Sequence, residues 1–395
     1  MKLFASEQSP AGHISKSDLQ RVLVMQLDDK SATVMLSPAL RTLRKALPDA
    51  ELTLMTSTAG SEVAPLLPWV DTVMVERAIG TDVVGNRAID PREEVAFVER
   101  MRRHNFSIAL IFTSLSQSPL RSAYACYLAG IPYRVGFAQG MSGSVLSHYL
   151  MPPTEDVHQV DRNLNLLDAI GIPSADQRME LSISQEVDNK ARELLETVGI
   201  NWDLPYLVLA PGAADVLSPY NPDHFASVAR ILSAQTEHQL VVVGGSIEAK
   251  ALQLTLQVAS ENLYGNIYSL VEKTTLPELA AIIRHASLTI ASNSVIIQFA
   301  DVFGCPMVIL HSETDMVSQW MPRNASARLL SRPAICSHCC NQANCLNGIN
   351  CLDIRPEEVA IAAFELLSGE TYEPPAYKGI LGYKIEDKQE QTSTR

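Results

Sequence analysis

The residues best placed for chemistry form a Ser-Asn-Ser turn in the last third of the chain. Ser292, Asn293 and Ser294 end the apolar run LTIASNS and precede a stretch with helical spacing. All three are preferred N-cap residues, so the first backbone N–H groups of that helix would be free to bind an anion. Ligands of open α/β sheets bind at the carboxyl ends of strands. The turn therefore indicates a phosphate site, and the alternative is an ordinary strand-to-helix turn.

A second chemical feature is a cluster of cysteines. Of the seven cysteines, Cys126 and Cys305 lie in apolar stretches and are expected to be packed thiols. The other five crowd one loop-like segment, in which four thiolates could close a tetrahedral, structural zinc site, namely Cys336, Cys339, Cys345 and Cys351. The alternatives are a reduced loop without metal and disulfides, which a cytoplasmic location disfavours.

The elements that must position these residues alternate between strands and helices, and the alternation occurs twice. The first series contains RVLVMQL, PALRTLRKALP, AELTLMT, DTVMV, SIALIF, AYACYLAGI, YRVGF and VDRNLNLLDAIGI. The second contains PYLVLAPGAA, QLVVVGG, NIYSL, PELAAIIRHA, LTIAS and PMVIL, with helices expected from Pro222, Ile247 and Ser294. This rhythm predicts two parallel sheets wrapped by helices. Gly130 and Gly171 are expected to end helices.

The length of 395 residues suits two domains of ordinary size. We expect one domain at residues 20–185 and the other at 200–370, with the boundary between Pro173 and Asp203. Residues 1–19 are polar and are expected to form a flexible arm. Residues 372–395 are charged and rich in Gln, which predicts a partly disordered tail.

Charge and hydropathy exclude several classes of protein. The formal net charge of −13 argues against a nucleic-acid-binding surface, so any phosphate must be held locally. No apolar run reaches the roughly 18 residues that a membrane-spanning helix needs. The first residues, MKLFASEQSPAGHIS, lack the apolar core of a secretory signal. The sequence therefore predicts a cytoplasmic protein.

Several motifs occur together in the order and spacing of one known family. They are VLVMQLDDKSATVMLSPALRTLRKALPDAELTLMT, LAGIPYRVGF, HQVDRNLNLLDAIGI, LVLAPGAA, VVVGGSIE, NIYSLVEKTTLPELAAIIRHASLTIASNS and FADVFGCPMVIL. From about Arg21 to Ser368 the chain resembles glycosyltransferase family 9, the ADP-heptose:lipopolysaccharide heptosyltransferases. The resemblance implies the α/β fold called GT-B, in which two Rossmann-like parallel-sheet domains face a cleft. Loops at residues 28–37, 211–220 and 292–298 would line that cleft.

The chain departs from the family pattern at the position of the expected base. The family carries Gly-Asp six to seven residues before the proline that matches Pro38, and that aspartate is thought to accept the proton of the acceptor hydroxyl. Here the two positions hold Ser31 and Ala32. The resemblance leaves Asp28 and Asp29, in the same loop, as substitute catalytic carboxylates. The alternative is that both lie in a solvated turn.

Other departures remove charge from the expected donor site. A family Lys-x-Trp is replaced by Ser218-Pro219-Tyr220, and an Asp-Ser-Gly-Pro-Met-His turn reads Asn293 to Gln298. Glu272 stands where the family has a glycine. The donor-binding residues implied by the resemblance are Gly212, Ser218, Glu248, Ser292, Asn293, Ser294 and Gln298. Glu248 would hold ribose hydroxyls, or it is only a first-turn acid favoured by the helix dipole.

Three functions agree with these residues. The first is transfer of a heptose-like sugar, with inversion, from a nucleotide-diphosphate donor such as ADP-heptose to a glycan or lipid-linked acceptor. It would require no cofactor for catalysis and would bring the protein to a membrane surface only through the acceptor. The second is a catalytically inactive GT-B-fold binding or scaffold protein. The third is a sugar-nucleotide binder with a regulatory output. The family pattern favours the first.

Overall fold

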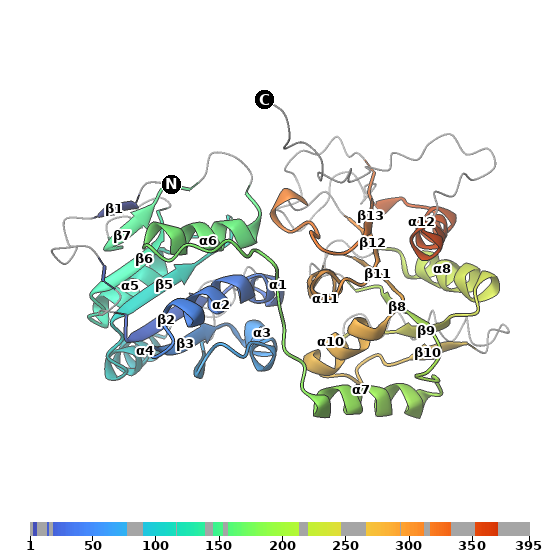
Figure 1. The fold of residues 1–395 in the computed structure, drawn as a ribbon, viewed down its shortest axis with the longest axis horizontal. Helices are drawn as coiled ribbons and strands as arrows, with labels where there is room; N and C mark the ends of the chain where they lie inside the picture. The colour runs from blue at the N-terminus through green and yellow to red at the C-terminus, as the bar shows by residue number, and fades with distance from the viewer. Residues whose placement is uncertain are drawn as a thin grey trace. The chain divides into compact units, whose positions relative to one another are not determined.

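The computed structural model describes residues 3–5, 14–15, 19–76, 90–115, 117–138, 145–152, 157–212, 220–245, 266–292, 294–311, 317–332 and 352–369. The chain divides into two compact units. The first comprises Met1–Ser184 with Thr275–Pro277 and Met316–Met321, and the second comprises Gln185–Thr274, Glu278–Asp315 and Pro322–Arg395. Each unit contains one sheet flanked by helices (Figure 1). This confirms the predicted α/β class with two Rossmann-like parallel sheets.

The first unit has a seven-stranded sheet in the order β1-β7-β6-β5-β2-β3-β4. The strands are β1 (Leu3–Ala5), β2 (Arg21–Gln26), β3 (Glu51–Thr56), β4 (Thr72–Val75), β5 (Ile108–Phe112), β6 (Tyr133–Phe137) and β7 (His148–Leu150). All neighbours are parallel except β1, which pairs antiparallel with β7. Strands β3 and β4 lie on one side of β2, and β5, β6 and β7 follow one another on its other side. The switch point, where ligands of such sheets bind, lies between β2 and β5.

The helices of the first unit flank this sheet. They are α1 (Lys30–Val34), α2 (Ser37–Ala46), α3 (Thr58–Ser61), α4 (Pro91–Arg103), α5 (Leu120–Leu128) and α6 (Gln159–Ala169), with a 3-10 turn at Ala64–Leu66. Alternate residues of β2, such as Leu23 and Met25, join a buried cluster with Phe97 and Met101 of α4 and Cys126 of α5. Helix α2 contacts α6, α4 contacts α5 and α1 contacts α3. Alternation of side chains along the strands therefore gives the sheet two apolar faces.

The second unit has a six-stranded, fully parallel sheet in the order β10-β9-β8-β11-β12-β13. The strands are β8 (Tyr206–Ala210), β9 (Gln239–Val242), β10 (Ile267–Ser269), β11 (Leu288–Ser292), β12 (Met307–Leu310) and β13 (Ala327–Leu330). The helices are α7 (Gln185–Val198), α8 (Pro222–Gln235), α10 (Leu276–His285), α11 (Val295–Phe303) and α12 (Pro356–Ser368), with a 3-10 turn at Val317–Gln319 that belongs to the first unit. The switch point of this sheet lies between β8 and β11.

Several local predictions can be compared with the structure. Gly130 and Gly171 both have φ of +80° directly after helices α5 and α6, which confirms their role in ending helices. Cys126 and Cys305 are buried thiols, as expected. The prediction that residues 28–37 form a loop is wrong in its middle, because α1 occupies Lys30–Val34. The helix expected from Ile247 lies outside the described residues.

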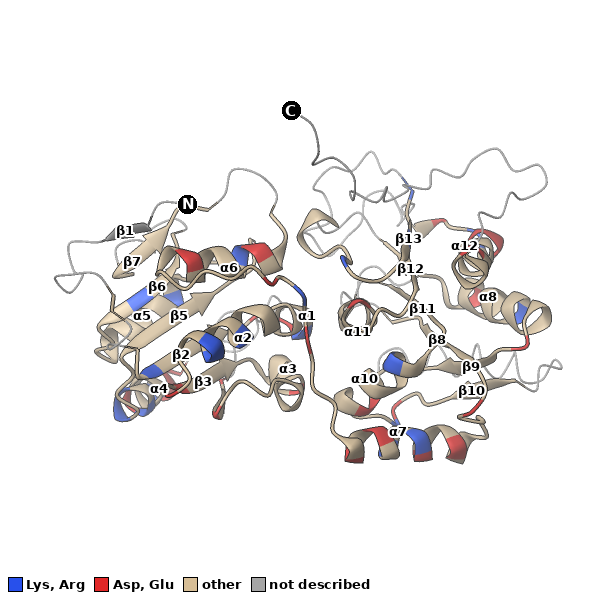
Figure 2. Cartoon of the chain, in the orientation of Figure 1, with Lys and Arg blue, Asp and Glu red and all other residues tan. Residues whose placement is uncertain are grey.

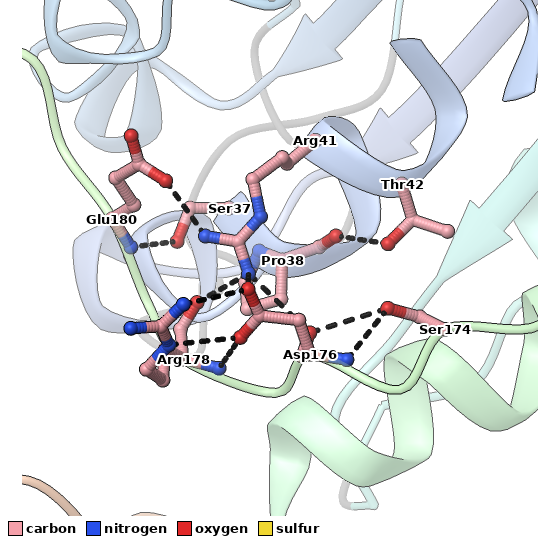
Figure 3. A network of polar contacts seen from close by, with 8 residues as sticks. All are labelled: Ser37, Pro38, Arg41, Thr42, Ser174, Asp176, Arg178 and Glu180. Atoms are coloured by element: carbon pink, nitrogen blue, oxygen red, sulfur yellow. Dashed lines mark hydrogen bonds and ion pairs between the residues drawn. The ribbon is translucent and has the colours of Figure 1, made fainter. Parts of the chain in front are cut away.

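A buried arginine fixes the chain that leaves the first sheet (Figure 3). Arg41 of α2 forms ion pairs with Glu180 at 2.7 Å and with Asp176 at 3.2 Å. It also donates hydrogen bonds to the backbone carbonyls of Asp176 and Arg178. Ser37 Oγ accepts a hydrogen bond from the backbone N–H of Glu180. The segment that follows α6 is therefore held against α2 before the second unit begins.

None of the helices in the described ranges is long and apolar enough to cross a membrane.

Candidate functional site

Asp28 lies at the switch point of the first sheet, where the carboxyl ends of three strands meet. Its Oδ2 accepts a hydrogen bond of 2.8 Å from the backbone N–H of Ser114, which follows β5. Its backbone carbonyl accepts a bond of 2.7 Å from Ser57 Oγ, which follows β3. Its own N–H donates to the side-chain oxygen of Gln26, the last residue of β2. The carboxylate is therefore fixed by contacts to β2, β3 and β5.

The environment of Asp28 changes its protonation. Burial raises the pKa of this carboxyl to about 6, and the negative charge of Asp29 acts in the same direction. The hydrogen bond from Ser114 and the positive charge of Arg162 act in the opposite direction. A general base works best when its pKa is near the working pH. Asp28 is therefore ionised at neutral pH and is a stronger base than an ordinary aspartate.

Asp29 has a different role from Asp28, although both are predicted catalytic residues. It is the N-cap of α1, and its Oδ1 accepts a hydrogen bond of 2.8 Å from the backbone N–H of Ala32. Its backbone carbonyl accepts from the N–H of Thr33. The residue is exposed. Because one carboxylate oxygen of Asp29 caps α1, Asp28 is the better candidate for proton transfer.

The structure adds a site residue that sequence reasoning missed. Arg162 of α6 is 3% exposed, and its guanidinium carbon lies 3.9 Å from the centre of the Phe137 ring. Its Nε donates a bond of 2.9 Å to the carbonyl of Thr113, next to the Ser114 N–H that holds Asp28. The available signal was an arginine within the helical stretch VDRNLNLLDAIGI, on a turn that also carries Val160 and Leu164.

Polar atoms without partners gather at this edge. Among the described residues, Gln26 Nε2, Thr56 Oγ1 and Thr113 Oγ1 are buried and have no hydrogen-bond partner. They sit at or directly after the carboxyl ends of β2, β3 and β5. Buried polar groups are normally paired, so three orphans at one edge indicate a place that water or a ligand completes.

The second candidate region follows β8 and β11 in the other unit. Ser292 is the last residue of β11, and Gln298 lies in the first part of α11; they are 1% and 2% exposed. Gly212 is buried just after β8, the neighbour of β11. The structure therefore places these three predicted donor-binding residues at the switch point of the second sheet, together with Ser294.

Ser294 corrects part of the capping prediction. It occupies the N-cap position of α11 with an extended backbone, but its side chain forms no capping hydrogen bond. In the part of the chain that the structure describes, three buried oxygens of this turn have no partner: Ser292 Oγ, Ser294 Oγ and Gln298 Oε1. The hydroxyl of Ser294, which was expected to accept a hydrogen bond from the first turn of α11, therefore accepts none from the described residues.

This turn is electrically neutral in its described part. The first turn of α11 carries no acidic residue and reads Val295, Ile296, Ile297 and Gln298, residue types that Figure 2 draws in tan. A phosphate bound there would meet backbone N–H groups, the helix dipole and neutral side chains. Neutral hydrogen bonds are about half as strong as charge-assisted ones, so the turn can orient an anion but binds it less tightly than a lysine would.

Two further residues lie at this edge. His311 directly follows β12 and is 1% exposed; burial lowers its pKa to about 4, so it is neutral at physiological pH. Its strand neighbour is β11, where Ser292 lies opposite Leu310. Glu272, which replaces a family glycine, has φ of +58° and donates its N–H to the carbonyl of Gly244. A left-handed conformation costs a residue other than glycine about 1 kcal/mol, so the family glycine fits this backbone better.

Ser218, Glu248 and Asn293 lie outside the described residues, as do Cys336, Cys339, Cys345 and Cys351. Within the described ranges, no group of three or more His, Cys, Asp or Glu residues could hold a metal ion. The zinc site therefore stays a prediction, and so does the shared cleft.

Comparison with known proteins identifies the family. The family model described as glycosyltransferase family 9 (heptosyltransferase) matches residues 95–349, more than half of the chain. The chain belongs to glycosyltransferase family 9. It is 24% identical over 294 residues to lipopolysaccharide heptosyltransferase 3 of Escherichia coli K12, covering 72% of this chain and 80% of that protein.

Solved structures of this family have the same fold. A family 9 glycosyltransferase of Veillonella parvula superposes with a TM-score of 0.71 at 18% identity, over 93% of this chain and 99% of the other. The ADP-heptose heptosyltransferase II of E. coli gives a TM-score of 0.69 at 17% identity, over 88% and 99%. The predicted GT-B fold is thus confirmed, and the family 9 chain described here is heptosyltransferase-like in sequence and architecture.

Proposed function

We propose that this family 9 protein transfers a heptose-like sugar from a nucleotide-diphosphate donor to a hydroxyl of a glycan or lipid-linked acceptor, with inversion at the sugar carbon. The donor would resemble ADP-heptose, because the matched relatives are named for heptose transfer to lipopolysaccharide and for ADP-heptose. A cytoplasmic location and contact with a membrane only through the acceptor are part of the proposal. Catalysis would need no cofactor, and zinc at the cysteines would be structural.

The observation that carries this proposal is the set of partnerless oxygens at the Ser292–Gln298 turn. A protein that never filled this turn would bury three polar atoms without compensation, each at a cost of about 1–3 kcal/mol. A sugar nucleotide offers hydroxyls as donors and phosphate oxygens for the α11 N-terminus. Donor binding would therefore satisfy groups that the described residues leave unsatisfied.

Asp28 supplies the other half of the reaction in this proposal. The acceptor oxygen forms a bond to the anomeric carbon of the donor, and the bond from that carbon to the diphosphate breaks. The hydroxyl proton moves to the Asp28 carboxylate, and the nucleoside diphosphate leaves with the bonding electrons. Attack opposite the leaving group inverts the carbon. General-base assistance of this kind contributes about 10²–10⁴ in rate.

The alternative function is a catalytically silent binding or scaffold protein. It is favoured by Ala32, which is 5% exposed within α1 and has no carboxyl group at the position where the family carries its aspartate. The replacement of the family lysine by Ser218, which removes a fixed positive charge, points in the same direction.

Calorimetric titration of the full chain with ADP-heptose, ADP-glucose, UDP-N-acetylglucosamine and ADP tests the proposal. We expect saturable binding of ADP-heptose, tighter than of ADP-glucose, and release of ADP when an acceptor from a heptose-deficient lipopolysaccharide is added. Binding without ADP release would favour the silent binding protein. No binding of any nucleotide at millimolar concentration would contradict both functions that involve a donor.

A further inference from the structure

Arg162 forms one end of a short chain of hydrogen bonds that reaches Asp28. Its Nε donates to the carbonyl oxygen of Thr113 at 2.9 Å, and the N–H of Ser114 donates to Asp28 Oδ2 at 2.8 Å. The carbonyl of Thr113 and the N–H of Ser114 belong to one peptide group. The guanidinium therefore polarises the same peptide unit that holds the carboxylate, and such chains strengthen their members cooperatively.

Burying this guanidinium has a cost that its neutral contacts do not offset. It is 3% exposed, and within the described ranges its Nη1 is buried with no hydrogen-bond partner. Burial lowers its pKa to about 10, so it remains charged at neutral pH, and the negative charge of Asp28 acts to restore that pKa. A buried charge without a counter-charge is strongly destabilising, and Asp28 is the counter-charge here.

A second buried arginine of the same unit shows what a purely structural role looks like. Arg134 of β6 is 5% exposed and lies 5.4 Å from the centre of the Tyr127 ring. It donates to the carbonyls of Ile131, Pro132 and Val145. Like Arg162 it joins a ring and backbone oxygens, but among the described residues its hydrogen bonds do not lead to Asp28. The two arginines thus form a matched pair.

We propose that Arg162 is a positioning residue that keeps the Asp28 carboxylate oriented and ionised through the Thr113–Ser114 peptide group. The proposal rests on the proposed function, in which Asp28 accepts the proton of the acceptor hydroxyl. Several charged groups lie on the elements around this carboxylate, and α6 carries Asp161 and Asp168 besides the arginine. The others are Asp29 and Lys30 at the start of α1, Glu62 after α3, which pairs with Lys30 at 2.8 Å, and Arg162 of α6. Of these, Asp29 raises the pKa of Asp28 and Arg162 lowers it.

The test is an NMR titration of the full chain with carboxyl-labelled aspartate, in which Asp28→Asn identifies the resonance. We expect Arg162→Gln to raise the pKa of Asp28 by a fraction of a unit, because an opposite charge is lost whose effect is smaller than that of burial, the Ser114 hydrogen bond or Asp29. Arg162→Lys keeps the charge but not the planar Nε–H group, and should raise it by about half as much. Arg134→Gln should leave it unchanged. Circular dichroism confirms that each variant is folded.

Turnover gives a second readout. With Arg162→Gln the acidic limb of the kcat profile should move to higher pH by the same amount, with KM for the donor unchanged. An Asp28 pKa that stays at its wild-type value in folded Arg162→Gln overturns the proposal; should that variant not fold, the same result in Arg162→Lys overturns it. If the pKa moves but Asp28→Asn retains full turnover, the base role of Asp28 fails while the link to Arg162 stands.

Discussion

The carboxyl edges of the two sheets share a topology but differ in charge. At the switch point of the first sheet, the ionisable carboxylate of Asp28 and the buried guanidinium of Arg162 are hydrogen-bonded to the same peptide group, that between Thr113 and Ser114. At the switch point of the second sheet, Ser292, Ser294, Gln298 and the neighbouring His311 are neutral, and the acidic Glu272 lies farther along that edge, after β10. Both edges also bury polar atoms that lack partners among the described residues.

The difference separates two kinds of chemistry. A carboxylate whose pKa is near 6 can exchange a proton at physiological pH, whereas hydroxyl and amide groups cannot. Neutral groups at a helix N-terminus can instead orient an anion through hydrogen bonds and the helix dipole. Under the proposed function, Asp28 at the first edge accepts the proton of the acceptor hydroxyl. The Ser292–Gln298 turn at the second edge binds the leaving diphosphate. Substitutions at one edge should therefore change properties that substitutions at the other do not.

Asp28→Asn should have the largest effect. The amide keeps the size of the side chain and can still accept the Ser114 N–H, but it cannot take up a proton. We expect kcat for sugar transfer to fall about 10²–10⁴-fold, with donor affinity unchanged. Release of ADP under saturating donor and acceptor measures kcat, and calorimetry measures affinity.

Asp29→Asn is the matched control, because asparagine caps a helix as well as aspartate does and α1 should remain intact. A similar fall of kcat in both variants would mean that catalysis depends on the conformation of this loop and not on the Asp28 carboxylate alone. Adding Ala32→Asp to Asp28→Asn is a further check. Recovery of kcat would show that the position used by the family still faces the acceptor hydroxyl.

The fold could be predicted well from the sequence because strand and helix periods are local properties. Runs such as SIALIF and LTIAS became β5 and β11, and Gly130 and Gly171 ended their helices. Helix α1 was missed because five residues, KSATV, are too short for a helical pattern. Its cap, Asp29, was instead read as part of a loop.

The site was harder to predict, because it depends on contacts between distant parts of the chain. Asp28 and Asp29 are adjacent and identical in type, and only the bonds to Ser114 and Ala32 distinguish them. Arg162 lies far from Asp28 in the sequence, and Thr113 of a third segment connects them. Ser294 has the right residue type for capping, yet its oxygen is unused. Residue type alone could not show which oxygens remain free.

Ser292→Ala should produce the next largest effect, at the neutral edge. Removing the hydroxyl should weaken binding of the nucleotide-sugar donor about tenfold, which is the loss of one hydrogen bond. The free protein should be as stable as wild type or more so, because a buried oxygen without a described partner disappears. Calorimetry with ADP-heptose and urea unfolding measure the two quantities.

Ser227→Ala provides the control for this variant. Ser227 lies on α8 of the same unit, and within the described residues its hydroxyl bonds to the Asp223 carbonyl and to Arg230 of the same helix. It should change neither affinity nor stability by a measurable amount. A Ser292→Ala protein that is clearly less stable, yet binds donor normally, would show that the hydroxyl has a structural partner and would remove this edge from the donor site.

The smallest effect is a pH dependence of stability that only the first edge should show. Since the pKa of Asp28 is raised from 3.8 to about 6 on folding, the folded protein binds more protons than the unfolded chain between these values. The contribution of Asp28 to stability is therefore fully present below pH 4 and is lost as the pH rises through 6. The free energy of unfolding of wild type minus that of Asp28→Asn should thus be greater at pH 4 than at pH 7.5. The same difference taken with Ser292→Ala should not change with pH, because no titrating group is removed. Urea unfolding of the three proteins across this range measures both differences. A difference for Asp28→Asn that grows with rising pH would mean that the folded protein holds this carboxylate below its ordinary pKa, and Asp28 would then be a structural anion paired with Arg162 and not a base.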